Sequence, residues 1–166
     1  MRPGWLLVPA VLALCSCQRP DFSSYRKAAS KLDFRLERVE PRLEMGLPLD
    51  RSKLGVRLVL RVENPTDVHF RAKRIVGDLG FEELGLMRRI GSVDLPQGVD
   101  LAPHGASPIV LDLSFPYNDL RRNWSALSHA VRSGDRTIWR LEGKASLEAF
   151  GIPFSLPFHT RYQRKP

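Results

Sequence analysis

The chain of 166 residues contains only two cysteines, Cys15 and Cys17, and both lie near its start. The remaining sequence therefore offers no thiol for a disulfide bond or a cysteine-based zinc site. A disulfide between the two cysteines would be badly strained, because a single residue separates them. The four histidines stand in four different segments and form no paired metal-binding motif. We expect no metal and no other cofactor.

Catalytic motifs are lacking as well. The sequence has no nucleophile elbow and no phosphate-binding loop. His104 stands in the turn sequence APHGAS, which favours a solvated loop residue over a catalytic base. A serine–histidine–aspartate site that only the folded chain assembles stays open, but no residue pattern recommends one. We expect a protein that is not an enzyme.

Basic residues outnumber acidic residues, but they never form a long run. The net charge of +8 would suit a nucleic acid or an anionic membrane surface. The charges are dispersed in pairs such as Arg88–Arg89 and Arg121–Arg122, and this dispersal favours an ordinary solvated surface. We therefore expect no nucleic-acid partner. The length fits one domain.

The apolar run Trp5–Leu14 is too short to span a membrane, which takes about 20 residues. Arg2 precedes the run, and small or thiol residues follow it. This order is typical of a secretory signal peptide. A buried N-terminal helix is the less favoured alternative.

The end of that run resembles the bacterial lipobox. Leu14 and Ser16 occupy the −3 and −1 positions relative to Cys17, whereas Cys15 would have leucine at −1, where a small residue is needed. We predict a lipoprotein signal peptide over residues 1–16, with lipidation at Cys17. Two or three acyl chains make a stable anchor, because each buried methylene contributes about 0.8 kcal/mol. Gln18 stands where aspartate would suggest inner-membrane retention, so we expect the outer membrane of a Gram-negative host, on the periplasmic side.

Residues 17–31 are polar and have little periodicity, and we predict that they form a tether, with a short helix over Tyr25–Leu32 as an alternative. One domain follows over residues 32–162. Its apolar residues alternate, and this pattern predicts strands over 34–45, 54–63, 75–81, 109–115, 139–148 and 152–159. The phase slips near Glu37 and Arg38, which predicts a β-bulge. Prolines on the outer phase of the last segment predict an edge strand or an irregular last strand.

One segment has a helical period. Leu120, Trp124, Leu127 and Val131 predict an amphipathic helix over residues 119–131, with Asn118 as N-cap and Gly134 at its end. The narrow apolar stripe favours a helix that covers one end of a sheet sandwich over one that lies on a membrane. About seven strands and one short helix predict an all-β sandwich.

The stretch from Leu54 to Leu86, followed by LAPHGAS and PIVLDLSF, resembles the late embryogenesis abundant type 2 family, also called the water stress and hypersensitive response domain. The resemblance covers roughly residues 33–160. Its most specific motif is Asn64-Pro65 after an alternating strand. Asn64 can hydrogen-bond the following turn and Pro65 fixes φ, so we expect a structural motif and not a catalytic one.

The resemblance implies an immunoglobulin-like or fibronectin-like sandwich and a non-enzymatic role in water stress or desiccation. We expect a membrane partner through the lipid anchor and client proteins or envelope components to protect. A rival hypothesis is a carrier of lipid or another apolar ligand. Its predicted groove is lined by Trp124, Phe154, Leu156 and Phe158.

Overall fold

The structure, a computed structural model, describes residues 22–83, 85–96, 98–133 and 137–164. In chain order the elements are α1 (Phe22–Ala29), β1 (Asp33–Glu44), η1 (Leu49–Arg51), β2 (Lys53–Asn64), β3 (Phe70–Glu83), β4 (Leu86–Leu95), β5 (Val99–Leu101), β6 (Gly105–Pro116), α2 (Tyr117–Leu120), η2 (Arg121–Asn123), α3 (Trp124–Ser133), β7 (Ile138–Ala149) and β8 (Ile152–Gln163). The predicted signal peptide, Cys17 and Gly134 lie outside the described residues.

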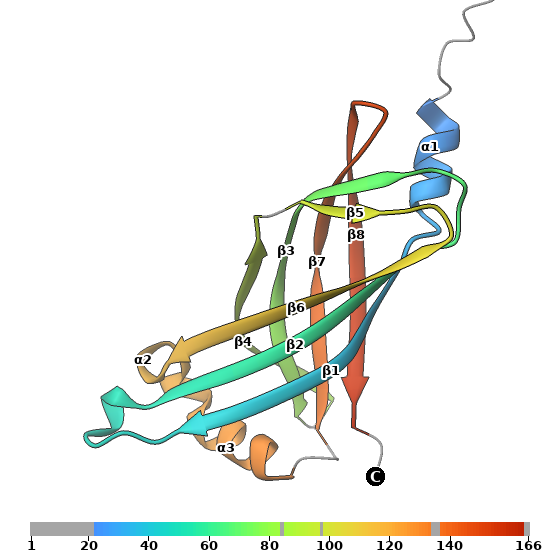
Figure 1. The fold of residues 1–166 in the computed structure, drawn as a ribbon. Coiled ribbons are helices and arrows are strands. Elements are labelled where there is room, and N and C mark those ends of the chain that lie inside the picture. The colour runs from blue at the N-terminus through green and yellow to red at the C-terminus, as the bar shows by residue number, and fades with distance from the viewer. Residues whose placement is uncertain (1–21, 84, 97, 134–136, 165–166) are drawn as a thin grey trace, which may run out of the picture.

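The strands form two antiparallel sheets, one of three strands in the order β1-β2-β6 and one of five in the order β4-β3-β7-β8 with β5 beside β3 (Figure 1). The predicted all-β sandwich is confirmed. Two strands went unpredicted. In β4 the buried residues Ile90 and Val93 stand three apart, so no period of two exists, and β5 has only three residues.

The alternating pattern marks the inner face of each sheet. In β2 every second residue is buried, and the buried row runs Leu54, Val56, Leu58, Leu60, Val62 and Asn64. A strand points successive side chains to opposite faces, so this row forms the floor of the core. The predicted bulge is present, because the pairing of β1 with β2 shifts register between Leu36 and Arg38. The predicted edge strand is also confirmed, since β8 ends the five-stranded sheet.

The two sheets meet along β1 and β8. Phe34 stacks on Phe158 with ring centroids 4.9 Å apart. Beside the bulge, the Leu36 N–H donates a hydrogen bond of 2.8 Å to the buried hydroxyl of Thr160. An aromatic stack and a satisfied polar contact thus fix one seam of the sandwich.

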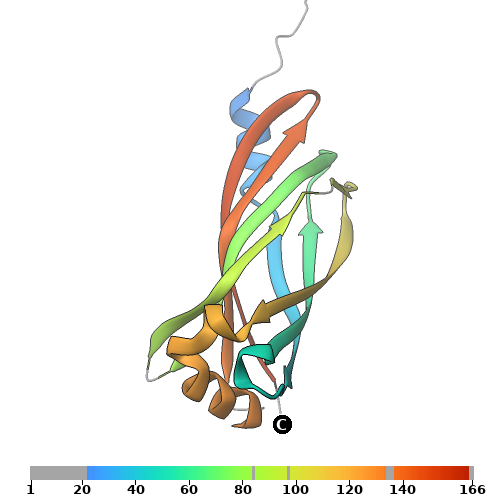
Figure 2. The ribbon, with the colours of Figure 1, turned by 90° about the vertical axis from the view of Figure 1, so that its left-hand side faces the viewer.

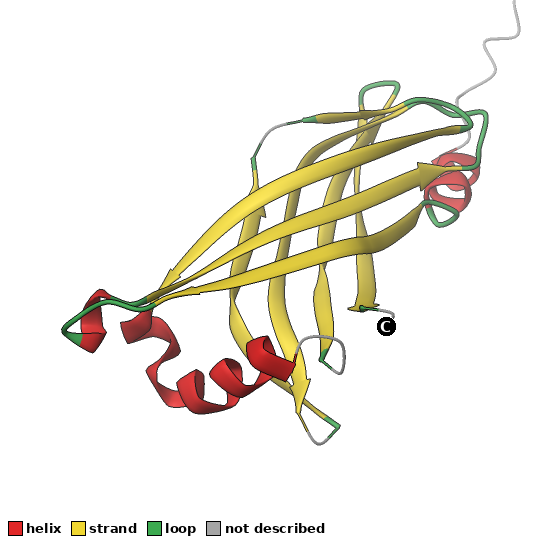
Figure 3. Cartoon of the chain, turned by 60° about the horizontal axis from the view of Figure 1, so that its bottom comes forward, coloured by secondary structure: helices red, strands yellow, loops and turns green. Residues whose placement is uncertain are grey.

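The predicted helix is present as three consecutive pieces, α2, η2 and α3, which cover one end of the sandwich (Figure 3). Leu120 and Leu127 are buried, as their spacing predicted. Trp124 and Val131 are only half-buried, and Ala130 takes the buried position instead. The break at η2 changes the phase of the stripe, because a 3₁₀ turn holds fewer residues than an α turn.

The predicted N-cap at Asn118 is wrong. Strand β6 pairs with β2 as far as Pro116, so the helix begins directly after the strand, and Pro116 is the N-cap with no side-chain hydrogen bond. Instead, the first N–H of the helix, that of Tyr117, donates a hydrogen bond of 2.9 Å to the carbonyl oxygen of Ser52. A backbone acceptor from the β1–β2 loop therefore replaces a capping side chain.

Helices and loops gather at the two ends of the sandwich (Figure 2). We call α1 and the β7–β8 turn (Phe150 and Gly151) the α1 end. We call α2, η2, α3 and the β1–β2 loop (residues 45–52) the α3 end. The predicted tether contains α1, and Ala29 at its last turn is buried in the core with 1% of its surface exposed.

Candidate functional site

The predicted groove residues do not come together at one place. Phe154 lies near the start of β8, at the α1 end, where it meets Phe70 edge to face at 5.8 Å. Phe158 lies further along β8 against Phe34, and Leu156 is half-buried between them. Trp124 begins α3 at the opposite end, where its ring contacts Tyr117 at 5.0 Å (Figure 1). The residues of β8 share an inner face, but Trp124 belongs to a different part of the molecule.

A groove does lie at the α1 end, between α1 and the start of β8. Its volume is about 620 Å³. Its described lining consists of Ser23, Tyr25, Arg26, Lys27, Ser30, Ile152, Pro153 and Phe154. Helix α1 is fixed in this place because Ala29 and Leu32 reach into the core. The groove therefore has one wall from α1 and one from the edge strand.

The two walls differ in chemistry. Strand β8 contributes Ile152, Pro153 and Phe154, which are apolar. Helix α1 contributes Arg26 and Lys27 in its last turn and carries no acidic residue. An apolar floor with cations beside it suits an amphipathic anion. Of the residues that line this groove, Phe154 was predicted from the sequence as a groove residue. The position of α1 beside β8 was not predicted, because it follows from the fold and not from a local pattern.

The β7–β8 turn stands beside this groove. Ala149 pairs with Ile152, so the loop consists of two residues, Phe150 and Gly151. Their φ angles are +50° and +79°, the signs of a type I′ hairpin turn. Phe150 is 74% exposed, and its ring lies 5.3 Å from that of Tyr25 on α1. The turn and the helix thus form one surface.

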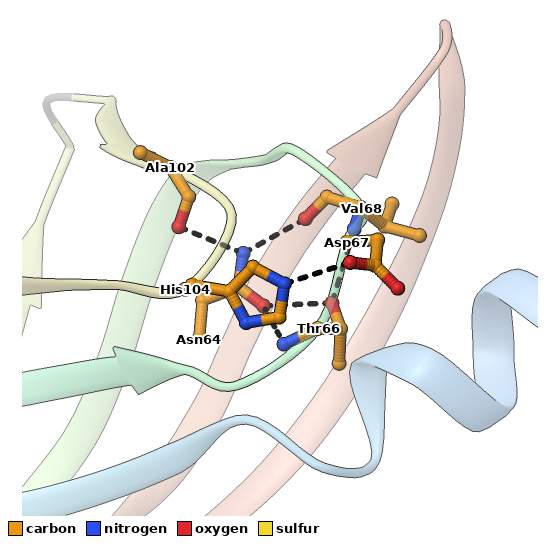
Figure 4. Close-up of polar contacts among 6 residues, drawn as sticks. All are labelled: Asn64, Thr66, Asp67, Val68, Ala102 and His104. Atoms are coloured by element: carbon orange, nitrogen blue, oxygen red, sulfur yellow. Dashed lines mark hydrogen bonds and ion pairs between the residues drawn. The ribbon is translucent and has the colours of Figure 1, made fainter.

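A buried polar hub, Asn64, stands at the end of the inner row of β2 (Figure 4). Its Nδ2 donates to the carbonyl oxygens of Val68 at 2.8 Å, Leu101 at 3.0 Å and Ala102 at 3.1 Å. Its Oδ1 accepts from the N–H of Thr66 at 3.1 Å and from the Thr66 hydroxyl at 2.8 Å.

The bond from Asn64 to the following turn is the one that the sequence predicted. The bonds to Leu101, at the end of β5, and to Ala102, just after it, were not predicted, because both residues are distant from Asn64 in the chain. Continuing the alternation of β2 by one step would have placed Asn64 on the inner face. The Asn64 side chain, which is only 1% exposed, thus joins the end of β2 to the β2–β3 connection and to the end of β5.

His104 lies next to the hub in a left-handed conformation, with φ of +52° (Figure 4). Its Nε2 is 2.7 Å from Oδ1 of Asp67, and both side chains are largely exposed. A groove of about 390 Å³ brings His104 near Glu63, so a histidine and a carboxylate do share a hollow. Of the described residues that line it, none carries a hydroxyl or thiol nucleophile. Hydrolases of the serine or cysteine type take their nucleophile from such a side chain.

In the described part of the chain, no cluster of three or more histidine, cysteine, aspartate or glutamate side chains could hold a metal ion. Within the same residues, no helix has both the length and the apolar character needed to cross a bilayer.

The outer face of the three-stranded sheet is covered with ion pairs. The pairs are Arg35 with Asp33 and Glu63, Arg61 with Glu37 and Glu63, Arg38 with Glu40, Lys53 with Glu44 and Arg57 with Asp112. We call this the paired-charge face. Arg57 donates to both oxygens of Asp112, at 2.7 Å and 3.1 Å. These bonds lower the pKa of Asp112 below its ordinary value and raise the pKa of Arg57.

Comparison with known proteins identifies a family. The family model described as late embryogenesis abundant protein matches residues 59–161. No curated protein matches the chain. A crystal structure of a protein from Archaeoglobus fulgidus is 17% identical at a TM-score of 0.45, and the match covers 79% of this chain and 98% of that one. A solution structure of a protein from Arabidopsis thaliana is 16% identical at a TM-score of 0.49, covering 81% and 78%.

Proposed function

The chain belongs to the late embryogenesis abundant family, as the Asn64-Pro65 resemblance predicted, and on this premise we propose that it protects other proteins or membranes during water stress. It does so by binding and shielding, without catalysing a reaction. Lipidation at Cys17 holds it in the cell envelope, in the outer membrane on the periplasmic side. The domain is then concentrated in the cell envelope, the part of the cell that is exposed first to drying and osmotic change.

The observation that carries this proposal is the paired-charge face. Acidic and basic side chains alternate on it, so the face is dense in charge without an excess of either sign. Surfaces of this kind keep proteins soluble, because they offer neither a large field of one sign nor an apolar patch. A shielding protein needs this property at the high concentrations that drying produces.

A drying and freeze–thaw assay on a labile enzyme tests the protective role. We expect the purified protein to preserve more enzyme activity than an equal mass of serum albumin. Protection no better than that of albumin would remove the proposal, because any inert protein would then serve.

The anchor has a separate test in detergent phase partitioning. Cys17→Ala should move the protein from the detergent phase to the aqueous phase. Cys15→Ala is the matched control and should leave it in the detergent phase. Equal partitioning of the two variants would contradict lipidation at Cys17.

A second function, binding of an apolar ligand with an anionic head group, is favoured by the groove at the α1 end. Its apolar wall of Ile152, Pro153 and Phe154 suits an acyl chain, and Arg26 with Lys27 suits the head group. Burial of each methylene in such a wall contributes about 0.8 kcal/mol.

Native mass spectrometry of the purified protein tests this second function, with co-purifying lipid as the expected result. Ile152→Glu places a charge on the groove wall and should abolish the lipid-bound mass. Ser155→Glu, on the exposed face of the same strand, is the matched control and should retain it. The absence of any non-covalently bound lipid on the unaltered protein would count against the groove.

A further inference from the structure

The β7–β8 turn carries an exposed aromatic residue where the backbone disfavours one. Phe150 has φ of +50°, a left-handed conformation that glycine, asparagine and aspartate adopt most easily. Its side chain is 74% exposed, so core packing does not account for the choice of phenylalanine. An unfavourable backbone position held by an exposed aromatic ring points to a contact outside the chain.

Cations follow Tyr25, the aromatic neighbour of this turn, along the chain. Tyr25 packs against Phe150 with ring centroids 5.3 Å apart, and Arg26 and Lys27 follow directly on α1. Lys31, just beyond the helix, is exposed like both of them. Aromatic rings beside lysine and arginine side chains are the composition that favours the interface of an anionic bilayer.

The chain length places this end near a membrane. Cys17 precedes Phe22, the first residue of α1, by five residues. Five residues span at most about 18 Å when fully extended. A lipid on Cys17 would thus keep the start of α1 within that distance of the bilayer surface, and the turn that touches Tyr25 lies beside the same helix.

We propose that the α1 end docks on the surface of an anionic lipid bilayer, with the Phe150 ring inserted between head groups and Arg26, Lys27 and Lys31 against the phosphates. The nearness of the bilayer rests on the anchor of the proposed function. The contact itself rests on the exposed ring and the cations. Docking fixes the orientation of the sandwich, which attachment through a lipid alone would leave free.

Fluorescence quenching in vesicles tests the contact. The full chain with Cys15→Ser and Phe150→Cys is purified from envelope membranes, labelled with bimane and reconstituted into phosphatidylcholine–phosphatidylglycerol vesicles. Leu47→Cys in the same background is the matched control, because Leu47 is also an exposed apolar residue, 90% exposed, but stands on the β1–β2 loop at the α3 end. We expect brominated acyl chains to quench the label at position 150 and to leave that at position 47 unchanged.

The other outcomes overturn the proposal. Quenching at neither position, at both, or only at position 47 shows that the α1 end does not face the bilayer. Shielding of the label at position 150 from aqueous iodide in detergent, without lipid quenching in vesicles, assigns the turn to contact with a second copy of the chain. The background chain without an introduced thiol reports the anchor separately, because Cys17 takes up bimane only where it carries no lipid.

Charge reversal tests the role of the cations. Arg26→Glu with Lys27→Glu should reduce quenching at position 150 in anionic vesicles. Arg121→Glu with Arg122→Glu makes the same charge change on η2, at the opposite end, and should not. Equal quenching in both double variants, or in vesicles of phosphatidylcholine alone, contradicts electrostatic docking.

Discussion

The Asn64→Ala substitution removes a side chain that joins three backbone segments inside the sandwich. Three of its contacts are buried: those to the carbonyl of Leu101, to the N–H of Thr66 and to the Thr66 hydroxyl, which also accepts from the N–H of Val68. Those to Val68 and Ala102 are partly buried, so water can replace the lost donor there. A buried polar group left without a partner costs about 1–3 kcal/mol. The Thr66 hydroxyl keeps its contact with Val68, so the loss at the two buried backbone groups should lower the free energy of unfolding by about 3 kcal/mol.

Asn64→Asp separates the donor from the acceptor role of the side chain. The shape is almost unchanged, and the remaining oxygen can still accept from Thr66. The other oxygen replaces the amide donor and faces three carbonyl oxygens, which repel it. At neutral pH this variant should be less stable than Asn64→Ala. Protonation turns the carboxylate into a donor, so the folded state gains protons more readily than the unfolded state, and the deficit should shrink as pH falls.

Urea unfolding followed by circular dichroism measures these differences. Asp67→Asn is the matched control in the same turn, because the Asp67 side chain is 97% exposed and its contact with His104 should contribute no more than about 0.5 kcal/mol. A free energy of unfolding of Asn64→Ala within about 0.5 kcal/mol of that of the unaltered protein would contradict the role of Asn64 as a hub. An Asn64→Asp variant as stable as the unaltered protein at neutral pH would contradict it equally.

Three further predictions concern other parts of the fold. Gly143→Ala should lower the free energy of unfolding by about 2–3 kcal/mol, since its new Cβ would collide with the carbonyl oxygen of Val76; an unchanged melting temperature would contradict this. Asp112→Asn should lower the melting temperature slightly at neutral pH. This difference from the unaltered protein should vanish as pH falls below the lowered pKa of Asp112, because a protonated aspartate is as uncharged as the asparagine that replaces it. A difference in melting temperature that widens on acidification would refute this prediction. Phe150→Asn should keep or raise the melting temperature by easing the left-handed turn, whereas a fall of several degrees would assign the ring a packing role.

Local patterns predicted those features whose causes are local. The buried row of β2 and the bulge beside Leu36 follow from the alternation of apolar residues, and the fold class follows from the number of such segments. Strand β4 was missed because Ile90 and Val93 do not alternate. The N-cap was misplaced because a backbone acceptor, the carbonyl of Ser52, makes a capping side chain unnecessary.

The candidate sites depend on contacts that no pattern contains. The sequence pattern predicts that Asn64 bonds the turn that follows it. The carbonyl oxygens of Leu101 and Ala102 come within reach of its amide only in the folded chain. The same holds at the α1 end, where the rings of Tyr25 and Phe150 lie side by side although the two residues are far apart in the sequence. A period of two reports which face is buried, but it carries no information on which distant segment covers an edge strand.

The proposed orientation joins the two candidate functions to one geometry. With the α1 end on the bilayer, the groove of Arg26, Lys27 and Phe154 opens beside the head groups, where an amphipathic ligand enters without crossing water. The α3 end is then the farthest from the membrane. Its β1–β2 loop exposes 66% of Met45 and 90% of Leu47, and such apolar side chains can contact a client that the bilayer does not hold. In the proposed orientation, lipid binding and client binding would use opposite ends, so the quenching contrast between positions 150 and 47 also decides which end is free for clients.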